Sequence, residues 1–374
     1  MSAYAAALSR HHEPAEAVAE VVGEVIERLG AGPDVAVLFV TEAHVDALGD
    51  AAGAIRSILR PGTMIGTTAV AVAAGRSEVE DAPAMALWAA QMDGVTGVRM
   101  AAGAGPDDEE LAAAHSLVLL ADPFTHPVGT ALEELAVRHP HLTVVGGLAS
   151  APGGNRMLLD GEVHRDGAVG LLLSGSVRVE PVVSQGCRPI GTPLVVTSST
   201  DNLIHEIAGQ PAVDRLRAVL EGLSEDDKTL ARRGLHIGRV VDEHREQFRQ
   251  GDFLIRGVLG IDRASGGLAV GDRVPVGSTV QFQVRDAASA HDDLVGALDG
   301  AEADAALLFT CNGRGMRLFG TPDHDAGTVA DRLADPPVAG MFCAGEIGPV
   351  GDRVYIHGFT ASLALFRSGP EGRR

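Results

Sequence analysis

Aromatic residues and lysine are nearly absent from the sequence. Phe, Trp and Tyr make up 3% of the 374 residues, so the hydrophobic cores must be built from Ala, Val, Leu and Ile. Lys228 is the only lysine, and the other basic residues are arginines. Together with the many Ala and Gly residues, this bias indicates a GC-rich coding sequence and carries no chemistry by itself.

Cysteine is scarce and long apolar runs are missing. Cys187, Cys311 and Cys343 are too scattered for a disulfide framework or a Cys-x-x-Cys zinc site. No run of about 18 uncharged apolar residues predicts a transmembrane helix, and residues 14–30 predict a charged amphipathic helix in place of a signal peptide. The 14 histidines show no metal-ligand spacing on a predicted helix. We expect a cytoplasmic protein with no membrane insertion, no cofactor and no metal site.

Basic residues are also much fewer than acidic residues. The chain has 50 acidic residues against 30 basic ones and a net charge of −20. Such a surface repels phosphate backbones and anionic lipid headgroups, which makes nucleic acid and membrane surfaces poor partners. The length is sufficient for two domains, each with its own core.

A strand–helix–strand–loop–strand pattern recurs three times along the chain. Each occurrence has an apolar strand, a helix, and a second strand that contains glycine. The paired strands are predicted at 35–41 with 62–69, at 117–122 with 142–150, and at 305–310 with 338–345. The first two strands of each copy should be parallel neighbours, because a helix connects them. A hairpin should add a third strand, expected at 167–173 in the second copy and at 354–360 in the third.

The region between the second and third copies follows another pattern. Residues 200–222 predict two helical pieces broken at 209–211, and residues 253–285 predict antiparallel strands. Asp286 is expected to cap a further helix. Glycines and prolines at 186–193 predict a domain boundary. The fold class is therefore α/β with some α+β character and mixed sheets, divided into an N-terminal helix (1–30), a first domain (31–190) and a second domain (191–374).

Two strand ends near the C-terminus carry the candidate site. Residues 307–315 and 340–349 are apolar runs that stop at small, polar and charged residues. Arg314, between two glycines, can present its guanidinium to a carboxylate or phosphate, or pair with a surface aspartate. Glu346 can bind an ammonium group, act as a general base, or pair with Arg314, Arg256 or Arg285. A cation and an anion at one site suit a zwitterion.

The same segments offer a thiol chemistry as an alternative. Cys311 or Cys343, with His357 and a carboxylate, has the groups that a thiol-dependent enzyme needs. A buried cysteine at a strand end can equally be a small apolar residue. The glycine-rich stretches contain neither a phosphate-binding loop with its lysine nor a dinucleotide fingerprint.

These residues resemble a known family. The run 309–315, then 340–349 and 357–360, is similar to the C-terminal signature of FIST proteins, and 253–262 and 284–286 also resemble that domain. Residues 144–147 and 166–171 are similar to the N-terminal FIST domain. The resemblance covers about 32–366. It departs from the family at 66–70, where a final glycine that members often carry is missing.

The resemblance implies a stand-alone, bacterial-type sensory protein for signal transduction that binds a small ligand such as an amino acid. The expected ligand-binding residues lie at the two strand ends and on one antiparallel strand: Cys311, Asn312, Arg314, Gly345, Glu346 and Arg256. Outside the two FIST-like halves little of the chain is left for an output domain, so the signal is expected to pass to a separate signalling protein. A thiol-dependent enzyme and a ligand-free interaction scaffold are the alternatives.

Overall fold

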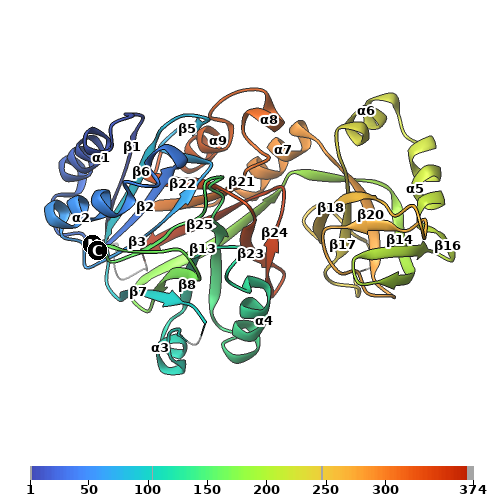
Figure 1. Cartoon of the computed structure of the whole chain (residues 1–374), viewed down its shortest axis with the longest axis horizontal. Coiled ribbons are helices and arrows are strands. Elements are labelled where there is room, and N and C mark those ends of the chain that lie inside the picture. Colours follow the sequence, from blue (N-terminus) through green and yellow to red (C-terminus); the bar gives the residue numbers. More distant parts are fainter. Residues whose placement is uncertain (1, 103, 246, 369–374) are drawn as a thin grey trace. The chain divides into compact units, whose positions relative to one another are not determined.

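A computed structural model describes residues 2–102, 104–245 and 247–368. The chain forms two compact units (Figure 1). The first unit contains the residues up to 183, residues 295–356 and the residues from 360 on. The second contains residues 184–294 and 357–359. The domain division predicted at residue 190 stays a prediction.

The first copy of the recurring unit forms as predicted. Strand β2 (Val35–Thr41), with the short 3₁₀ helix η1 (Glu42–His44), leads into α2 (Leu48–Leu59) and then into β3 (Thr63–Ala69). β2 pairs in parallel with β3 and antiparallel with β6 (Met85–Gln91). The first strand of the copy is therefore central, as expected for a helical crossover followed by a returning strand.

The second and third copies repeat this order. In the second, β8 (Ser116–Ala121), α4 (Val128–Arg138) and β9 (Thr143–Leu148) precede β12 (Ala168–Leu173). In the third, β21 (Ala305–Cys311), α8 (Met316–Phe319), α9 (His324–Leu333) and β22 (Val338–Cys343) precede β25 (Thr360–Ser368). The α/β class with mixed sheets is thus confirmed. The returning strand predicted at 354–360 was wrong, because that segment forms a hairpin strand and β25 returns instead.

Each copy passes a hairpin to a different copy. Hairpin β4–β5 (Ala71–Ala74, Ser77–Glu80) follows the first copy but pairs with β22 of the third. Hairpin β10–β11 (Met157–Leu159, Glu162–His164) of the second copy pairs with β3 of the first. Hairpin β23–β24 (Glu346–Val350, Arg353–His357) of the third copy pairs with β9 of the second. The exchange closes a ring in which every copy covers the sheet edge of another.

One further strand completes each of the three six-stranded sheets. β1 (Ala3–Ser9) lies beside β6, β7 (Val95–Met100) beside β12, and β13 (Val177–Gln185) beside β25. Helix α3 (Asp108–Ala113) precedes β8, with Asp107 and Glu110 forming a capping box at its N-terminus. The three sheets therefore share one strand order, from the added strand to the received hairpin.

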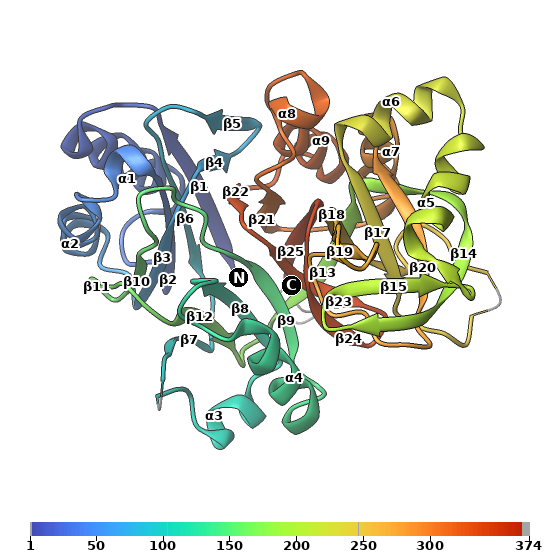
Figure 2. The same ribbon diagram turned by 45° about the vertical axis from the view of Figure 1, so that its right-hand side comes forward.

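The three sheets share one hydrophobic core. Helix α1 (Pro14–Leu29) forms where predicted, and α1 and α2 cover the same face of the first sheet (Figure 2). The opposite face of that sheet contributes to a core to which all three copies supply first-strand residues. These are Val37, Phe39, Val118, Leu120, Leu307 and Phe309. No helix in the described part of the chain is long and apolar enough to cross a membrane.

Equivalent glycines mark the closest approach of the first two strands in each copy. Gly66, Gly146 and Gly340 lie opposite a leucine of the first strand. A Cβ atom at these positions would lie 2.4, 1.9 and 2.2 Å from that leucine's carbonyl oxygen. Only glycine fits such an approach without a backbone shift.

The second unit is built around a seven-stranded sheet. Its strands are β14 (Cys187–Thr200), β15 (Leu203–Ile207), β16 (Gln210–Pro211), β17 (Leu235–Val240), β18 (Phe253–Ile261), β19 (Leu268–Val270) and β20 (Thr279–Arg285). Its helices are α5 (Ala212–Glu221), α6 (Glu225–Arg233) and α7 (Ala287–Ala297), the last of which continues into the first unit.

The outcomes of the predictions for this region are mixed. The antiparallel strands at 253–285 are confirmed. The Asp286 cap is also confirmed, because its Oδ1 accepts hydrogen bonds from the backbone N–H groups of Ala288 and Ser289. The first of the two helical pieces predicted at 200–222 was wrong. Residues 203–207 form β15, which pairs with β14 and β19, so cross-strand pairing overrides the local helical pattern.

The glycine contact gives a test of the ring geometry. We expect Gly340→Ala to destabilise the protein by about 1–3 kcal/mol, because the new methyl group meets the Leu308 backbone. Gly327→Ala, on α9 with nothing within 4 Å of the added atom, should be neutral or stabilising by up to about 1 kcal/mol. Urea unfolding of both variants measures the difference. Equal unfolding midpoints for Gly340→Ala and Gly327→Ala would contradict the close approach of β22 to β21.

Candidate functional site

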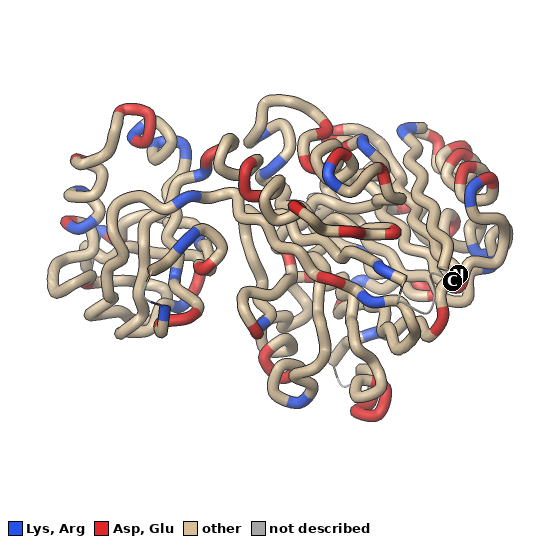
Figure 3. Tube along the Cα trace, turned by 180° about the vertical axis from the view of Figure 1, so that it is seen from behind, with Lys and Arg blue, Asp and Glu red and all other residues tan. Residues whose placement is uncertain are grey.

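Few of the acidic residues are buried. Figure 3 shows Asp and Glu spread over helices and loops along the trace. Among the described residues, four carboxyl side chains are buried: Glu78, Asp122, Asp325 and Glu346. Asp325 and Glu346 belong to the third copy, and Glu78 reaches that copy on the exchanged hairpin β4–β5. Buried charge is costly, so its concentration around one copy marks this region as the candidate site.

The two predicted strand ends lie side by side. Cys311 and Cys343, the last residues of β21 and β22, are partners in the parallel register. The backbone N–H of Asn312 donates to the Cys343 carbonyl oxygen at 2.9 Å. Asn312 and Ala344 are exposed, whereas Gly345 is buried and its carbonyl accepts from the Leu148 N–H at 2.8 Å.

Arg314 is held in a buried ion pair. Its Nε donates to Asp325 Oδ2 at 2.7 Å and its Nη2 to Oδ1 at 2.9 Å, with both side chains fully buried. The Thr310 hydroxyl donates to Asp325 Oδ2, and the His324 Nδ1 lies 3.0 Å from Oδ1. The Phe319 ring lies 5.1 Å from the guanidinium carbon. The partner is therefore a buried aspartate at the start of α9 and not a surface one.

The ion pair fixes the charge of both partners. Burial lowers the pKa of Arg314, but the charge and hydrogen bonds of Asp325 outweigh burial and raise it. Burial raises the pKa of Asp325, yet the Arg314 charge and the surrounding hydrogen bonds hold it well below its usual range. Removing one partner of such a pair costs about 3–5 kcal/mol, because the other charge is left uncompensated.

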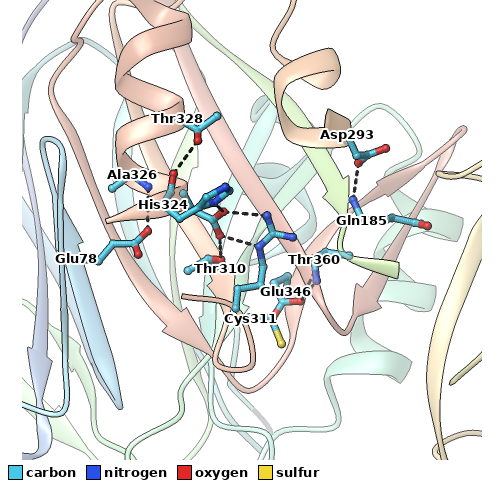
Figure 4. Close-up of polar contacts among 12 residues, drawn as sticks. Glu78, Gln185, Asp293, Thr310, Cys311, His324, Ala326, Thr328, Glu346 and Thr360 are labelled. Carbon is cyan, nitrogen blue, oxygen red and sulfur yellow. Dashed lines mark hydrogen bonds and ion pairs between the residues drawn. The ribbon is translucent and has the colours of Figure 1, made fainter. Parts of the chain in front are cut away.

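Glu346 is buried without an ion pair in the described part of the chain. Its Oε2 accepts from the Thr360 N–H at 3.1 Å and from the Thr360 hydroxyl at 2.7 Å (Figure 4). Burial raises the pKa of Glu346 to about 8, although Thr360, Arg314 and the Cys311 thiol lower it in part. Glu346 is therefore predominantly protonated at neutral pH. It pairs with none of the arginines proposed as its partner from the sequence.

The exchanged hairpins show what is unusual about Glu346. It pairs with Gly147, the residue after the close-approach glycine of the second copy. The equivalent hairpin residues are Val72, opposite Met341, and Met157, opposite Thr67. All three side chains are fully buried. The ring therefore accepts an apolar residue at this position, and the fold does not require the carboxyl group of Glu346.

Two buried polar atoms in this cluster have no nitrogen or oxygen hydrogen-bond partner among the described residues. Arg314 Nη1 is buried and has no hydrogen-bond acceptor among the described residues. Glu346 Oε1 is buried and receives no N–H or O–H from them. The two side chains interact electrostatically. Leaving such atoms unpaired costs about 1–3 kcal/mol each, which makes them candidates for contact with a ligand.

The hairpin β4–β5 adds a second carboxyl group with a raised pKa to the same region. Glu78 Oε1 accepts from the Ala326 N–H at 2.9 Å, in the first turn of α9 (Figure 4). Burial and the charge of Asp325 raise the pKa of Glu78 to about 8. Glu80, on the same strand, accepts from the Met316 N–H. The start of α9 is thus held by a segment of the first copy.

The ends of the three second strands meet beside the site. The Ser150 hydroxyl donates to the Phe342 carbonyl and accepts from the Val70 N–H at 3.0 Å. The Ala344 N–H donates to the Leu148 carbonyl at 3.0 Å. One serine of the second copy therefore joins the first copy to the third at the place where Cys343 ends its strand.

Other residues predicted for the site lie in the second unit. The Arg256 Nε donates to Asp272 Oδ2 at 2.9 Å, and both residues are in that unit. His357 is also part of the second unit. The ligand-binding role of Arg256 and the catalytic role of His357 stay predictions. In the same unit the Gln185 N–H donates to Asp293 Oδ2 at 2.7 Å (Figure 4).

A cavity of about 460 Å³ lies elsewhere in the first unit. Its walls contain none of the residues predicted for the site. They are formed by Ser2, Asp34, Gln91, Met92, Asp93, Ser176 and Ser368. The chemistry of the buried cluster, and not the size of a cavity, therefore identifies the candidate site.

Sequence reasoning missed three residues of the site. Asp325, Thr360 and Glu78 contact Arg314, Glu346 and the start of α9. Thr360 lies in the run 357–360 that resembles the family signature, but the sequence pattern assigns it no role. Asp325 lies in the first turn of α9, where an acidic residue is ordinarily explained by the helix dipole. Glu78 had no local signal, because its position depends on the hairpin exchange.

Comparison with known proteins accounts for most of the chain. The FIST N domain matches residues 34–210 and the FIST C domain matches residues 212–349. An uncharacterized protein of Mycobacterium bovis is 44% identical over 369 residues, covering 94% of this chain and 95% of its own length. An uncharacterized protein of Mycobacterium tuberculosis is 44% identical over 367 residues, covering 94% of this chain and 96% of its own length.

The raised pKa of Glu346 predicts a pH effect on stability. Between its ordinary pKa of 4.5 and about 8, the folded state holds a proton that the unfolded state has lost. Its contribution to stability therefore falls as the pH rises through this window, by at most about 1.4 kcal/mol per pH unit. Glu346→Gln cannot release that proton, so its stability should fall less between about pH 5 and about pH 8.

Urea unfolding midpoints of the wild type and Glu346→Gln across this range provide the measurement. Other titrating groups are common to both proteins and cancel in the difference. Glu162→Gln, at a side chain 83% exposed on β11, is the matched control and should follow the wild type. Parallel curves for the wild type and Glu346→Gln would show that Glu346 does not hold the extra proton.

Proposed function

The chain belongs to the FIST family, and we propose that it is a cytoplasmic small-molecule sensor whose ligand binds at the ends of β21 and β22. FIST N and FIST C domains together match most of the chain, and the sensory role that the resemblance to this family implies supports the proposal. The proposed ligand is an amino acid or a similar small carboxylate. The signal would pass to a separate signalling protein.

One observation carries the proposal. Arg314 Nη1 and Glu346 Oε1 are buried, and neither has a nitrogen or oxygen hydrogen-bond partner among the described residues. One belongs to a cationic side chain and the other to a carboxyl group. A carboxylate can accept a hydrogen bond from Arg314 Nη1 while Asp325 keeps the other two guanidinium contacts. An ammonium group can donate to Glu346 Oε1 and would favour its charged form. An amino acid supplies both groups on one small molecule.

Ligand entry would require a local rearrangement. Arg314 and Glu346 are fully buried, whereas Asn312 and Ala344, which directly follow β21 and β22, are exposed. The short loop 312–315 contains Gly313 and Gly315, and Gly315 has a φ of +58° that suits glycine. Movement of this loop would uncover the guanidinium. A ligand that binds only the opened form shifts the population toward it, which gives a sensor its signal.

The thiol-enzyme alternative gains little support from Cys343. Its side chain is fully buried, and burial raises the pKa of the thiol well above its usual value. A thiol in that state stays protonated near neutral pH and is a poor nucleophile toward a substrate from solution. Thermal unfolding in the presence of candidate ligands distinguishes a ligand-free scaffold from a sensor.

The sensor proposal is tested by thermal unfolding of the full chain against a panel of amino acids and small organic acids. A ligand at about 100 times its Kd stabilises the folded state by about 2.7 kcal/mol. Arg314→Lys keeps a positive charge beside Asp325 but loses Nη1, and Glu346→Gln loses the anion. Both should reduce the midpoint shift that the ligand causes in the wild type. Arg332→Lys, in an exposed ion pair with Asp299, is the matched control and should keep the shift.

Two results would count against the proposal. If no compound in the panel raises the midpoint, the ligand-free scaffold is favoured. If a compound does so equally in the wild type, Arg314→Lys and Glu346→Gln, the ligand binds at another site.

A further inference from the structure

Cys311 and Cys343 occupy facing positions on neighbouring strands. They are partners in the parallel register of β21 and β22, and each ends its strand. Neighbouring strands lie about 4.8 Å apart, within the Cα separation of about 4.4–6.8 Å that a disulfide spans. The spacing permits a direct sulfur–sulfur bond.

The two thiols differ in access. Cys311 is 6% exposed and Cys343 is fully buried. The Cys343 sulfur fills the space beside Gly147, where an added Cβ would lie 2.3 Å from it. An oxidant from solvent can therefore reach Cys311 first, while Cys343 is held close by as a second thiol. This is the arrangement of a reactive and a resolving cysteine.

The fold does not require this pair of cysteines. The equivalent register partners in the first copy are Thr41 and Ala69, which precede the same kind of loop. Glu346, fully buried, interacts electrostatically with Cys343 and accepts no N–H or O–H at Oε1 from the described residues. Because the carboxyl group of Glu346 is predominantly protonated, it can give its proton to a leaving group and recover one from a neighbouring thiol. The third copy thus combines two thiols with a carboxyl group that can exchange a proton with them, and its equivalents lack this combination.

We propose that Cys311 and Cys343 are a redox-active pair that forms a reversible intramolecular disulfide when the protein meets a peroxide. In the first step the Cys311 thiol attacks hydrogen peroxide, the O–O bond breaks, and a sulfenic acid and one water form. In the second step the Cys343 sulfur attacks the Cys311 sulfur and the S–O bond breaks. The Glu346 carboxyl group gives its proton to the departing hydroxide, which leaves as a second water, and it takes the Cys343 proton in exchange as the sulfur–sulfur bond forms. A dithiol reductant reverses the bond.

The disulfide would change the candidate site. It would draw the Cys311 sulfur toward Cys343, away from the Glu346 carboxyl whose pKa the thiol lowers. It would also withdraw the Cys343 sulfur from the space beside Gly147. Oxidation would therefore alter the surroundings of Glu346 directly. The redox proposal stands independently of the ligand proposal, because it requires only the two thiols and their neighbours.

Peptide mapping of the folded full chain tests the bond. The protein is treated with hydrogen peroxide, the peroxide is removed, and the remaining thiols are alkylated as the protein is denatured. Trypsin should then release residues 286–314 linked to residues 333–353, with the loss of two hydrogen atoms. Of the three cysteines, only Cys187 should be alkylated, and a reductant should restore alkylation of all three.

Two variants make the result specific. Cys187→Ser should still form the link, and Cys311→Ser should not, with circular dichroism confirming that both are folded. If Cys311→Ser does not fold, the linked peptides from the wild type and Cys187→Ser decide the matter. The proposal is overturned if all three cysteines remain alkylated after peroxide treatment. It is equally overturned if the link involves Cys187, joins two molecules, or is replaced by irreversible oxidation of Cys311.

Discussion

The open edge of the second strand in each copy is the constraint on which the first unit depends. β3, β9 and β22 each have a neighbour on one side only within their own copy, and an unpaired edge exposes backbone hydrogen-bonding groups. Each edge is closed by a hairpin from a different copy. No copy can therefore complete its sheet alone, and the shared core on the inner faces joins the three copies further.

This exchange brings the candidate site together. Glu346 reaches the second copy because it begins the hairpin of the third, and Glu78 reaches α9 because it lies on the hairpin of the first. The first two copies place Val72 and Met157 where the third has Glu346. A buried carboxyl with an elevated pKa is less stabilising there than an apolar side chain. Its presence at this position is the strongest structural indication that the third copy has a function beyond the fold.

The parts of the fold that could be predicted are those with local patterns. The parallel strand pairs, the helices between them and the Asp286 cap follow from apolar periodicity and capping residues. The hairpin exchange and the return of β25 could not be predicted, because an isolated hairpin sequence does not say which edge it will cover. For the site, the sequence identified Arg314 and Glu346 but not Asp325 or Thr360, which contact them only through tertiary packing. Their proposed roles as ligand contacts remain predictions.

The central claim is that the three copies are stable only as a closed ring. Native-state hydrogen exchange of the backbone amides in β2, β8 and β21 tests this most directly, because it measures the free energy at which each strand opens. The account predicts that these three strands open together, with the same free energy and the same dependence on denaturant. If one strand opened at a clearly lower free energy while the other two stayed protected, that copy would be independently unstable and the claim would be contradicted.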